Sequence, residues 1–404
     1  MKLWLPLFAA VACFAQDFSQ RGFFDTTFTG YPQTAPGDSG RAIGEALLRY
    51  EAFYKLSSAI RFSGGVDARS DTHRQVEREF GLSVQDRDRQ RPALAVRRFS
   101  ATLSRGRATF ELGKQFIRWG KADILNPTDR FAPRDFLNVV QNDFLAVTAA
   151  RLTYGSPSDS LDLVWAPRFT PSRVPLFNQR WVVLPVEGLR VRELELRFPG
   201  GPQLGARWNH IGSAAEFSVS FYEGYNHLPL VEAALVQLAP PEISVQRFYP
   251  KMRMYGGDAA IPLRFVTLKA EAGYFRSSTP QADEYVLYVI QLERQAGEWF
   301  FVGGYAGQVV TQARSTLEFA PDRGLSRALL GRAGYTIDAN RSVALETAVR
   351  ENGRGLWAKL EYSQALGQHW RATTGLAAIR GKDSDFLGQY HRNSHVILGL
   401  RYTF

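Results

Sequence analysis

The C-terminal segment, residues 392–404, constrains the fold more than any other stretch. Every second residue from Val396 to Phe404 is apolar, whereas the residues between them, from His395 to Thr403, are mixed and more polar. A period of two sends successive side chains to opposite faces of a β-strand. The chain therefore ends on a two-faced strand that terminates in an aromatic residue and whose apolar face needs an apolar environment.

The same alternation recurs along most of the chain in segments of about ten residues, which is the signature of a membrane-spanning β-barrel. Many of the connections are short and contain glycine or asparagine, such as residues 105–106 and 338–340. We expect strands over residues 22–31, 44–56, 60–67, 94–104, 107–116, 145–154, 161–165, 190–198, 203–211, 215–224, 256–262, 264–276, 284–294, 299–310, 326–337, 341–351, 355–365, 369–380 and 393–404. The pattern predicts an all-β fold, a transmembrane antiparallel β-barrel of about 18 strands, with 16 as the alternative.

The composition agrees with a barrel. Hydrophobic residues make up 45% of the 404 residues and aromatic residues 13%, with a mean hydropathy of -0.22. This is too polar for a helical membrane protein, but half of each barrel strand faces a wet lumen. A soluble sandwich or propeller is the competing all-β architecture, and no fixed blade repeat supports it.

The N-terminus predicts export. Lys2 precedes an apolar run from Leu3 to Val11, and small residues flank a cleavage position near Ala15. We expect residues 1–15 to be a signal peptide and residues 16–404 a single barrel domain in the outer membrane of a Gram-negative cell. Cys13, the only cysteine, lies in that signal; a lipidated Cys13 is the less favoured alternative.

Three stretches predict long extracellular or pore-folded loops. Residues 70–92 are densely charged, and we interpret them as a solvated surface. Residues 166–188 contain Pro167, Pro171 and Pro175, which exclude a central strand, and residues 225–250 are rich in proline and small apolar residues.

The segment 113–136 reads GKQFIRWGKADILNPTDRFAPRDF and is dense in charges and turn formers. Together with residues 304–308, the strand around Glu271 and the terminal residues 402–404, it resembles a group of outer-membrane porin-like barrels that includes the alginate-export porins and related uncharacterised barrels. The resemblance covers most of the mature chain. It implies a diffusion pore with a constricted, charged lumen; the alginate exporter passes an anionic polysaccharide through a positively charged lumen.

The residues themselves lead to a similar expectation. Asn126-Pro127 and Ala132-Pro133 break any strand, so the chain should leave the wall after Trp119 and return near Leu145. Charged side chains at a constriction select ions by sign, although the same charges can instead pair and fasten the loop to the wall; we favour pairing for the aspartates. Our candidates for the pore lining and constriction are Lys114, Arg118, Lys121, Asp123, Asp129, Arg130, Arg134, Asp135, Lys269, Glu271 and Arg401.

The aromatic residues are expected to form girdles at headgroup depth, with a sugar-stacking track inside the pore as the alternative. This set comprises Tyr50, Tyr54, Tyr274, Trp299, Tyr335, Trp357, Tyr362, Trp370, Tyr402 and Phe404. In the last strand, the set from Val396 to Phe404 should face lipid, while His395 and Arg401 face the lumen. The strand should pair with residues 22–31, and deletion of Phe404 should impair assembly by the barrel-assembly machinery.

The net charge of +10 and the arginines spread through the strands favour a basic lumen, not a nucleic-acid-binding arm. The sequence therefore predicts an anion-selective, porin-like channel for small or acidic hydrophilic solutes, in contact with outer-membrane lipid. No cofactor, metal site or catalytic residue is expected. A barrel hydrolase acting on lipid or peptide through His227 or His395 and a plugged structural or adhesive surface barrel are the alternatives.

Overall fold

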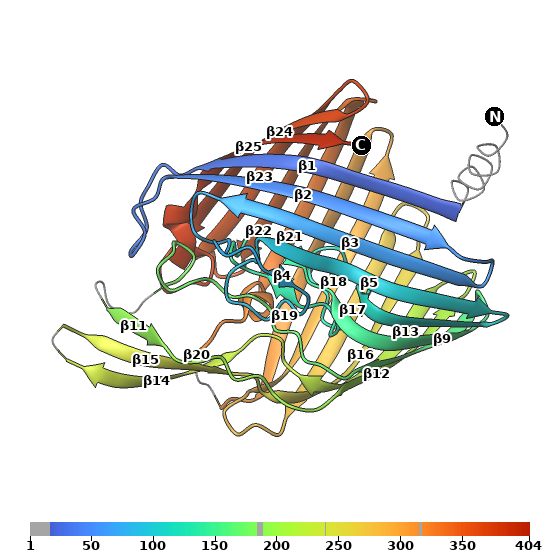
Figure 1. The fold of residues 1–404 in the computed structure, drawn as a ribbon, viewed down its shortest axis with the longest axis horizontal. Coiled ribbons are helices and arrows are strands. Elements are labelled where there is room, and N and C mark those ends of the chain that lie inside the picture. Colours follow the sequence, from blue (N-terminus) through green and yellow to red (C-terminus); the bar gives the residue numbers. More distant parts are fainter. Residues whose placement is uncertain (1–16, 184–188, 239, 315–316) are drawn as a thin grey trace, which may run out of the picture.

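The computed structural model describes residues 17–183, 189–238, 240–314 and 317–404; the expected signal peptide, residues 1–15, lies outside them. Within these residues, 18 strands form a closed antiparallel barrel, and the two-residue β4 lies alongside β5 in the same sheet (Figure 1). Each strand pairs with the next along the wall, and β25 pairs with β1 to close it. The wall strands are β1 (Phe18–Gly30), β2 (Ala42–Lys55), β3 (Ile60–Asp71), β5 (Leu94–Arg105), β6 (Ala108–Gln115), β9 (Val147–Gly155), β10 (Asp159–Ala166), β12 (Gln203–Ile211), β13 (Glu216–Tyr225), β16 (Lys251–Pro262), β17 (Thr267–Ser277), β18 (Glu284–Ala296), β19 (Trp299–Gln312), β21 (Ala328–Asp338), β22 (Arg341–Arg350), β23 (Gly355–Leu366), β24 (Trp370–Gly381) and β25 (His395–Thr403).

The remaining elements are short or lie outside the wall. They are β4 (Leu82–Ser83), β7 (Arg134–Asp135), β8 (Asp143–Phe144), β11 (Arg190–Glu193), β14 (Leu230–Gln237), β15 (Glu242–Phe248), β20 (Leu317–Glu318), the helix α2 (Pro321–Gly324) and the 3-10 helix η1 (Gly388–Asn393). No helix among the described residues has the length and hydrophobicity needed to cross a membrane.

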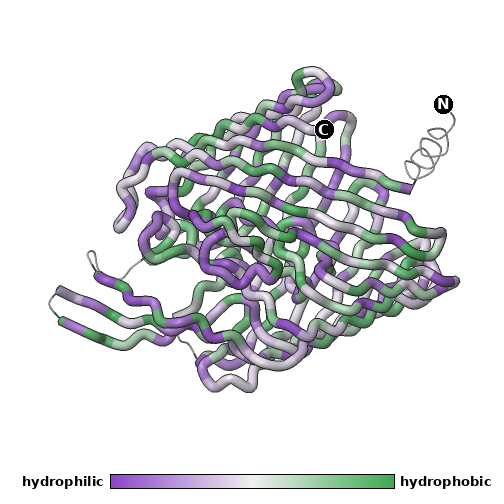
Figure 2. The backbone as a smooth tube through the Cα atoms, viewed as in Figure 1, coloured by the Kyte–Doolittle hydropathy of each residue, from purple (hydrophilic) through white to green (hydrophobic). Residues whose placement is uncertain are grey.

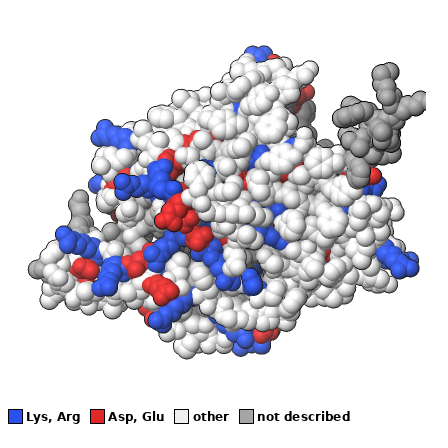
Figure 3. All heavy atoms as spheres, in the orientation of Figure 1, with Lys and Arg blue, Asp and Glu red and all other residues white. Residues whose placement is uncertain are grey.

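The wall has an apolar outer face. Apolar and polar residues alternate along its strands (Figure 2). On the face drawn in Figure 3, charged side chains gather around the loop end, and the wall beyond them is largely free of charge. In β25, Leu398 is 47% exposed and its neighbours Val396 and Leu400 are exposed too, whereas His395 is 3% exposed. The exterior therefore suits lipid, and the predicted all-β transmembrane barrel of about 18 strands is confirmed.

Barrel closure follows the predicted pairing. Phe23 faces Thr403 and Gly30 faces Val396 in the β1–β25 register. Beyond the strand, Phe404 and Gly22 exchange two backbone hydrogen bonds of 3.0 Å. A Cβ atom at Gly22 would lie 2.6 Å from the Phe404 ring, so glycine is required at this seam. The closed ladder removes both free sheet edges.

The two ends of the barrel differ. Tight connections, such as Gly106 at φ +58° between β5 and β6, lie at the end of the barrel where β1 begins (Figure 1). Long connections lie at the other end, where β11, β14, β15 and β20 form a four-stranded sheet that projects beyond the wall (Figure 1).

This projecting sheet corrects two predictions. Residues 190–198 were expected as a wall strand, but only β11 forms, and it pairs in parallel with β15. Residues 225–250 were expected as a loop, but they contain the β14–β15 hairpin. Alternation alone does not distinguish a strand that meets lipid from one that meets water on both faces.

The charged stretch 70–92 also differs from its predicted solvated surface. Gln75, Val76, Asp86 and Arg91 are buried or nearly buried, because this segment folds inward against other lumen loops. The described part of the proline-rich stretch behaves similarly: Trp181 is buried and its ring centroid lies 5.6 Å from that of Tyr390.

An apolar core lies inside the barrel, between the β6–β9 connection and the wall. Ile117, Leu125 and Phe131 are buried in it against wall residues such as Met254. The Phe131 ring packs edge-on to Tyr222 at 5.1 Å. The lumen is therefore partly filled by a packed loop.

Candidate functional site

The loop between β6 and β9, residues 116–146, is fastened to the wall by Glu271 of β17. The Glu271 carboxylate accepts hydrogen bonds from the backbone N–H groups of Lys121 at 3.0 Å, Ala122 at 3.1 Å and Thr128 at 2.8 Å, and from the Thr128 hydroxyl at 2.8 Å. Gly120 has φ +93°, and a Cβ atom there would lie 2.6 Å from both carboxylate oxygens. Glu271, only 2% exposed, is an anchor for the loop and does not reach the pore water.

Asp129 forms a second anchor. It accepts the backbone N–H of Trp119 at 3.0 Å and pairs with the Arg118 guanidinium. The Trp119 indole donates to Asp162 of β10 at 3.0 Å. Burial raises the pKa of Asp129 above its usual range despite the nearby Arg118 charge.

Three more of the predicted residues pair at the loop–wall junction. Lys121 pairs with Glu216 at 2.5 Å, and Lys269 bridges Asp123 at 3.0 Å and Glu293 at 2.6 Å. These charges join loop to wall, as the pairing interpretation anticipated for the aspartates.

A buried ion-pair network lies next to this loop. Asp135 accepts from Arg91 at 2.9 Å and Arg173 at 3.3 Å, and Arg173 also reaches Asp86 at 2.9 Å. Lys114, 4% exposed, pairs with Asp86 at 2.5 Å. Burial alone would raise the pKa of Asp135, but Arg91 and Arg173 lower it below its usual range. Lys114, expected at the pore lining, contacts protein groups instead of pore water, whereas Asp135 pairs with arginines as expected for the aspartates.

Three arginines of the loop lie over aromatic rings. Arg118 and Arg134 stack on the Phe144 ring, at 3.5 Å and 4.6 Å from its centroid, and the Arg118 side chain is 43% exposed. Arg130 lies over Phe275 and pairs with Asp322 at 3.8 Å. The Arg118 side chain is thus more exposed than those of Lys121 and Arg130, at 23% and 13%.

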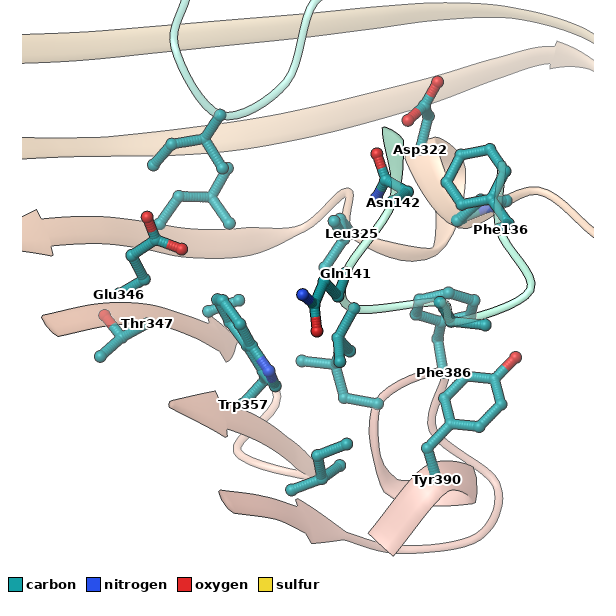
Figure 4. Close-up of a pocket in the computed structure, with 18 of the residues that line it drawn as sticks. Phe136, Gln141, Asn142, Asp322, Leu325, Glu346, Thr347, Trp357, Phe386 and Tyr390 are labelled. Atoms are coloured by element: carbon teal, nitrogen blue, oxygen red, sulfur yellow. The ribbon is translucent and has the colours of Figure 1, made fainter. Parts of the chain in front are cut away.

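One lumen cavity, of about 300 Å³, lies against β21–β24. We call it the aromatic cavity, because Trp357, Phe386 and Tyr390 line it (Figure 4). The Trp357 indole N–H has no protein acceptor among the described residues. The expected girdle position of Trp357 was wrong, because its side chain turns inward; Trp299, Trp370 and Phe404 are exposed.

A second cavity, of about 330 Å³, lies against β1–β3. We call it the arginine cavity. Gln141 and Asn142, at the tip of the β6–β9 loop, line both cavities and so separate them. The charged residues that line the arginine cavity are Arg49, Arg69, Arg91, Arg401, Asp25, Glu45 and Asp143. Arg401, predicted from the last strand, pairs here with Asp25 at 2.5 Å.

The arginine triad Arg49, Arg69 and Arg97 was not among the predicted residues. Arg49 and Arg69 occupy inward positions of β2 and β3, where strand alternation alone could have found them. Arg97 could not be found in this way. The β3–β5 register shifts so that Gly65 faces Arg98 and Val66 faces Val96, which leaves Arg97 as the extra residue of a β-bulge. Arg97 reaches Asp67 at 3.7 Å, and both Arg97 and Arg98 approach the Phe116 ring.

The histidines named for an enzyme have other surroundings. His227 is buried, with its ring nitrogens 2.6 Å and 2.8 Å from the carbonyl oxygens of Thr170 and Arg130. His395 is buried, with Nδ1 2.7 Å from the Asn393 carbonyl oxygen. Neither ring has a hydroxyl partner, and the described residues contain no cluster of three metal-ligating side chains.

The overall shape is similar to those of solved porins. A BenF-like porin from Pseudomonas fluorescens Pf-5 aligns over 97% of this chain and 99% of its own, with a TM-score of 0.57 and 8% identity. OccAB4 of Acinetobacter baumannii (TM-score 0.55, 10% identity) and the outer membrane protein opdK of Pseudomonas aeruginosa (0.53, 8%) each align over 96% of this chain and 99% of their own.

These likenesses define a fold class. The chain is a closed outer-membrane β-barrel with the fold of porins, as its apolar exterior also requires. No protein-family model and no curated protein matches the sequence.

Proposed function

We propose that the protein is a porin-like channel in the outer membrane that passes small hydrophilic solutes passively and favours anions. The observation that carries this proposal is the arginine cavity, in which four arginines and three carboxylates line one side of the lumen. An excess of positive charge at a constriction raises the local concentration of anions.

Acidic sugars and small organic acids are the proposed cargo. The alginate-export resemblance of residues 113–136 supports acidic sugars, and the arginine cavity supplies donors suited to carboxylates. The porin-like fold supports a channel in preference to an enzyme.

Planar-bilayer recording tests this function. With a tenfold KCl gradient across the bilayer, we expect discrete conductance steps and a reversal potential shifted toward that of chloride. A silent or cation-selective protein would contradict the anion preference.

A plugged surface barrel is the second candidate function. The apolar core formed by Ile117, Leu125 and Phe131 inside the lumen favours it, since packed loops obstruct a pore. The same recording separates the two candidates: a correctly folded protein without conductance would identify the plugged barrel.

A further inference from the structure

We infer that the arginine triad Arg49, Arg69 and Arg97 is a carboxylate-binding site and that the Asp143 carboxylate of the loop tip occupies it as an exchangeable counter-ion. A carboxylate of the solute displaces Asp143 during passage. This inference rests on the proposed channel function, which it extends by assigning a site and a ligand class.

The triad already has one permanent counter-ion, Asp67 of β3. Arg49 binds it in a bidentate manner, at 2.7 Å and 2.9 Å, and Arg69 binds it at 3.0 Å. Asp67 is buried and lies on a wall strand directly opposite Arg49. One carboxylate on a rigid strand therefore neutralises one of the three cations permanently.

Asp143 is held much less tightly. A single oxygen, Oδ2, lies 3.4 Å from Arg49, 3.8 Å from Arg69 and 3.5 Å from Arg97. Charge-assisted hydrogen bonds between such groups are about 2.7–2.9 Å long, so none of these contacts is optimal. The Asp143 side chain is 49% exposed, whereas the arginine side chains are mostly covered.

The position of Asp143 allows it to exchange. It belongs to the two-residue β8, which pairs only with the equally short β7, and not to the wall. Its other oxygen, Oδ1, accepts the N–H of Phe144 at 3.0 Å, so the loop orients the carboxylate toward the triad. The arginine cavity gives a solute access, since Arg49, Arg69 and Asp143 all line it.

The charges explain why the ligand should be a carboxylate. Three guanidinium groups face two carboxylates, and removal of Asp143 would leave Asp67 alone against three cations. An incoming carboxylate replaces the negative charge and the hydrogen-bond acceptors that Asp143 supplies to the three guanidinium groups. Competition from Asp143 weakens solute binding, and weak binding permits the release that conduction requires.

Equilibrium binding of sodium glucuronate to the full barrel in detergent, measured by calorimetry, tests the inference. Asp143→Asn keeps the shape and the acceptor for Phe144 but removes the competing charge. We expect it to bind glucuronate about tenfold more tightly than the unaltered protein, as loss of a half-exposed charge interaction allows. Asp143→Ser should tighten binding in the same direction.

Asp338→Asn is the matched control. Asp338 is 40% exposed, close to the exposure of Asp143, and pairs with Arg341 at 2.6 Å at the β21–β22 turn, outside the arginine cavity. This substitution should change glucuronate affinity by less than about twofold. The affinity for glucose, which lacks the carboxylate, should be the same for all variants. Equal tightening by Asp338→Asn, or no glucuronate binding by Asp143→Asn, would overturn the site.

The binding result is independent of conduction. A barrel that is silent in a bilayer but binds glucuronate more tightly after Asp143→Asn contradicts the channel and supports the site. A barrel that conducts anions but shows no response to Asp143→Asn overturns the site alone.

Discussion

The tip of the β6–β9 loop lines both lumen cavities, but the two cavities differ in the charged and aromatic side chains of their walls. The arginine cavity has four arginines and three carboxylates in its lining, a formal charge of +1. The aromatic cavity has two arginines, Arg134 and Arg332, against the three carboxylates Asp123, Asp322 and Glu346, a formal charge of -1. Because each wall strand contributes every second residue to the lumen, neighbouring arcs of one barrel can differ in chemistry while their lipid-facing sides stay alike.

The difference extends to how the walls are stabilised. Beside the arginine cavity, buried ion pairs such as Asp135 with Arg91 and Arg173 hold the inward loops. Beside the aromatic cavity, Leu330, Ala348 and Ile379 make an apolar surface. Leu325, Phe386 and Tyr390 pack against it. Substitutions should therefore act through unpaired charge on one side and through lost apolar contact on the other.

The largest expected effect is that of Asp135→Ala on the arginine side. It leaves two buried guanidinium groups without their shared counter-ion, which should cost about 3–5 kcal/mol of stability. Thermal unfolding in detergent measures the loss. Asp322→Ala, which breaks a longer and more exposed pair on the aromatic side, should change stability by less than about 1 kcal/mol.

The stabilisation by Asp135 should depend on pH. The pKa of Asp135 is lowered in the folded protein, so its contribution is present above the ordinary aspartate pKa and is lost as the pH falls through the folded value. The stability gap between the unaltered protein and Asp135→Ala should therefore narrow only below about pH 4. A gap that narrows near neutral pH would contradict this assignment.

Glu271→Ala should act on both cavities, because it releases the loop that divides them. Three backbone N–H groups and one hydroxyl lose their acceptor, and we expect a loss of about 2–3 kcal/mol and a larger single-channel conductance. Glu346→Ala provides the control for stability, since the ion pair that Glu346 makes among the described residues is the exposed one with Arg332 at 3.5 Å. An unchanged conductance for Glu271→Ala would show that the loop does not limit the pore.

Trp357→Ala should cost less stability than Asp135→Ala or Glu271→Ala, about 1–2 kcal/mol, because the ring lines a cavity and is only partly buried. It tests whether the aromatic cavity binds rings. Binding of p-nitrophenyl glucoside should weaken by roughly 3–10-fold through loss of stacking, while glucuronate binding should not change. Weaker glucuronate binding together with unchanged p-nitrophenyl glucoside binding would contradict the different ligand preferences of the two cavities.

The wall could be predicted from the sequence because its pattern is local. The alternation predicted the wall strands, and the amphipathic last strand with its terminal aromatic residue predicted the closure between β25 and β1. The projecting sheet could not be predicted, since β11 alternates like a wall strand and differs only in its surroundings.

The site was predictable only in part. Charge density singled out the loop that enters the lumen, and the expectation of pairing held for Asp123, Asp129 and Asp135. The burial of Lys114 depends on Asp86, 28 residues earlier in a segment that was expected to be solvated. The inward position of Arg97 depends on a β-bulge, in which β5 has one residue more than β3 over the same length. The residue types of β5 do not reveal this bulge.

Paired cysteine substitutions test the central claim most directly. Cys13 is the only cysteine, so after Cys13→Ser a single reporter thiol can be placed at Thr27 in the arginine cavity or at Val140 in the aromatic cavity. The rates of modification by anionic and cationic methanethiosulfonates give a charge preference for each cavity. We expect faster anionic modification of Thr27→Cys and no anionic preference at Val140→Cys. Equal preferences at both positions would contradict the difference in charge between the two cavities.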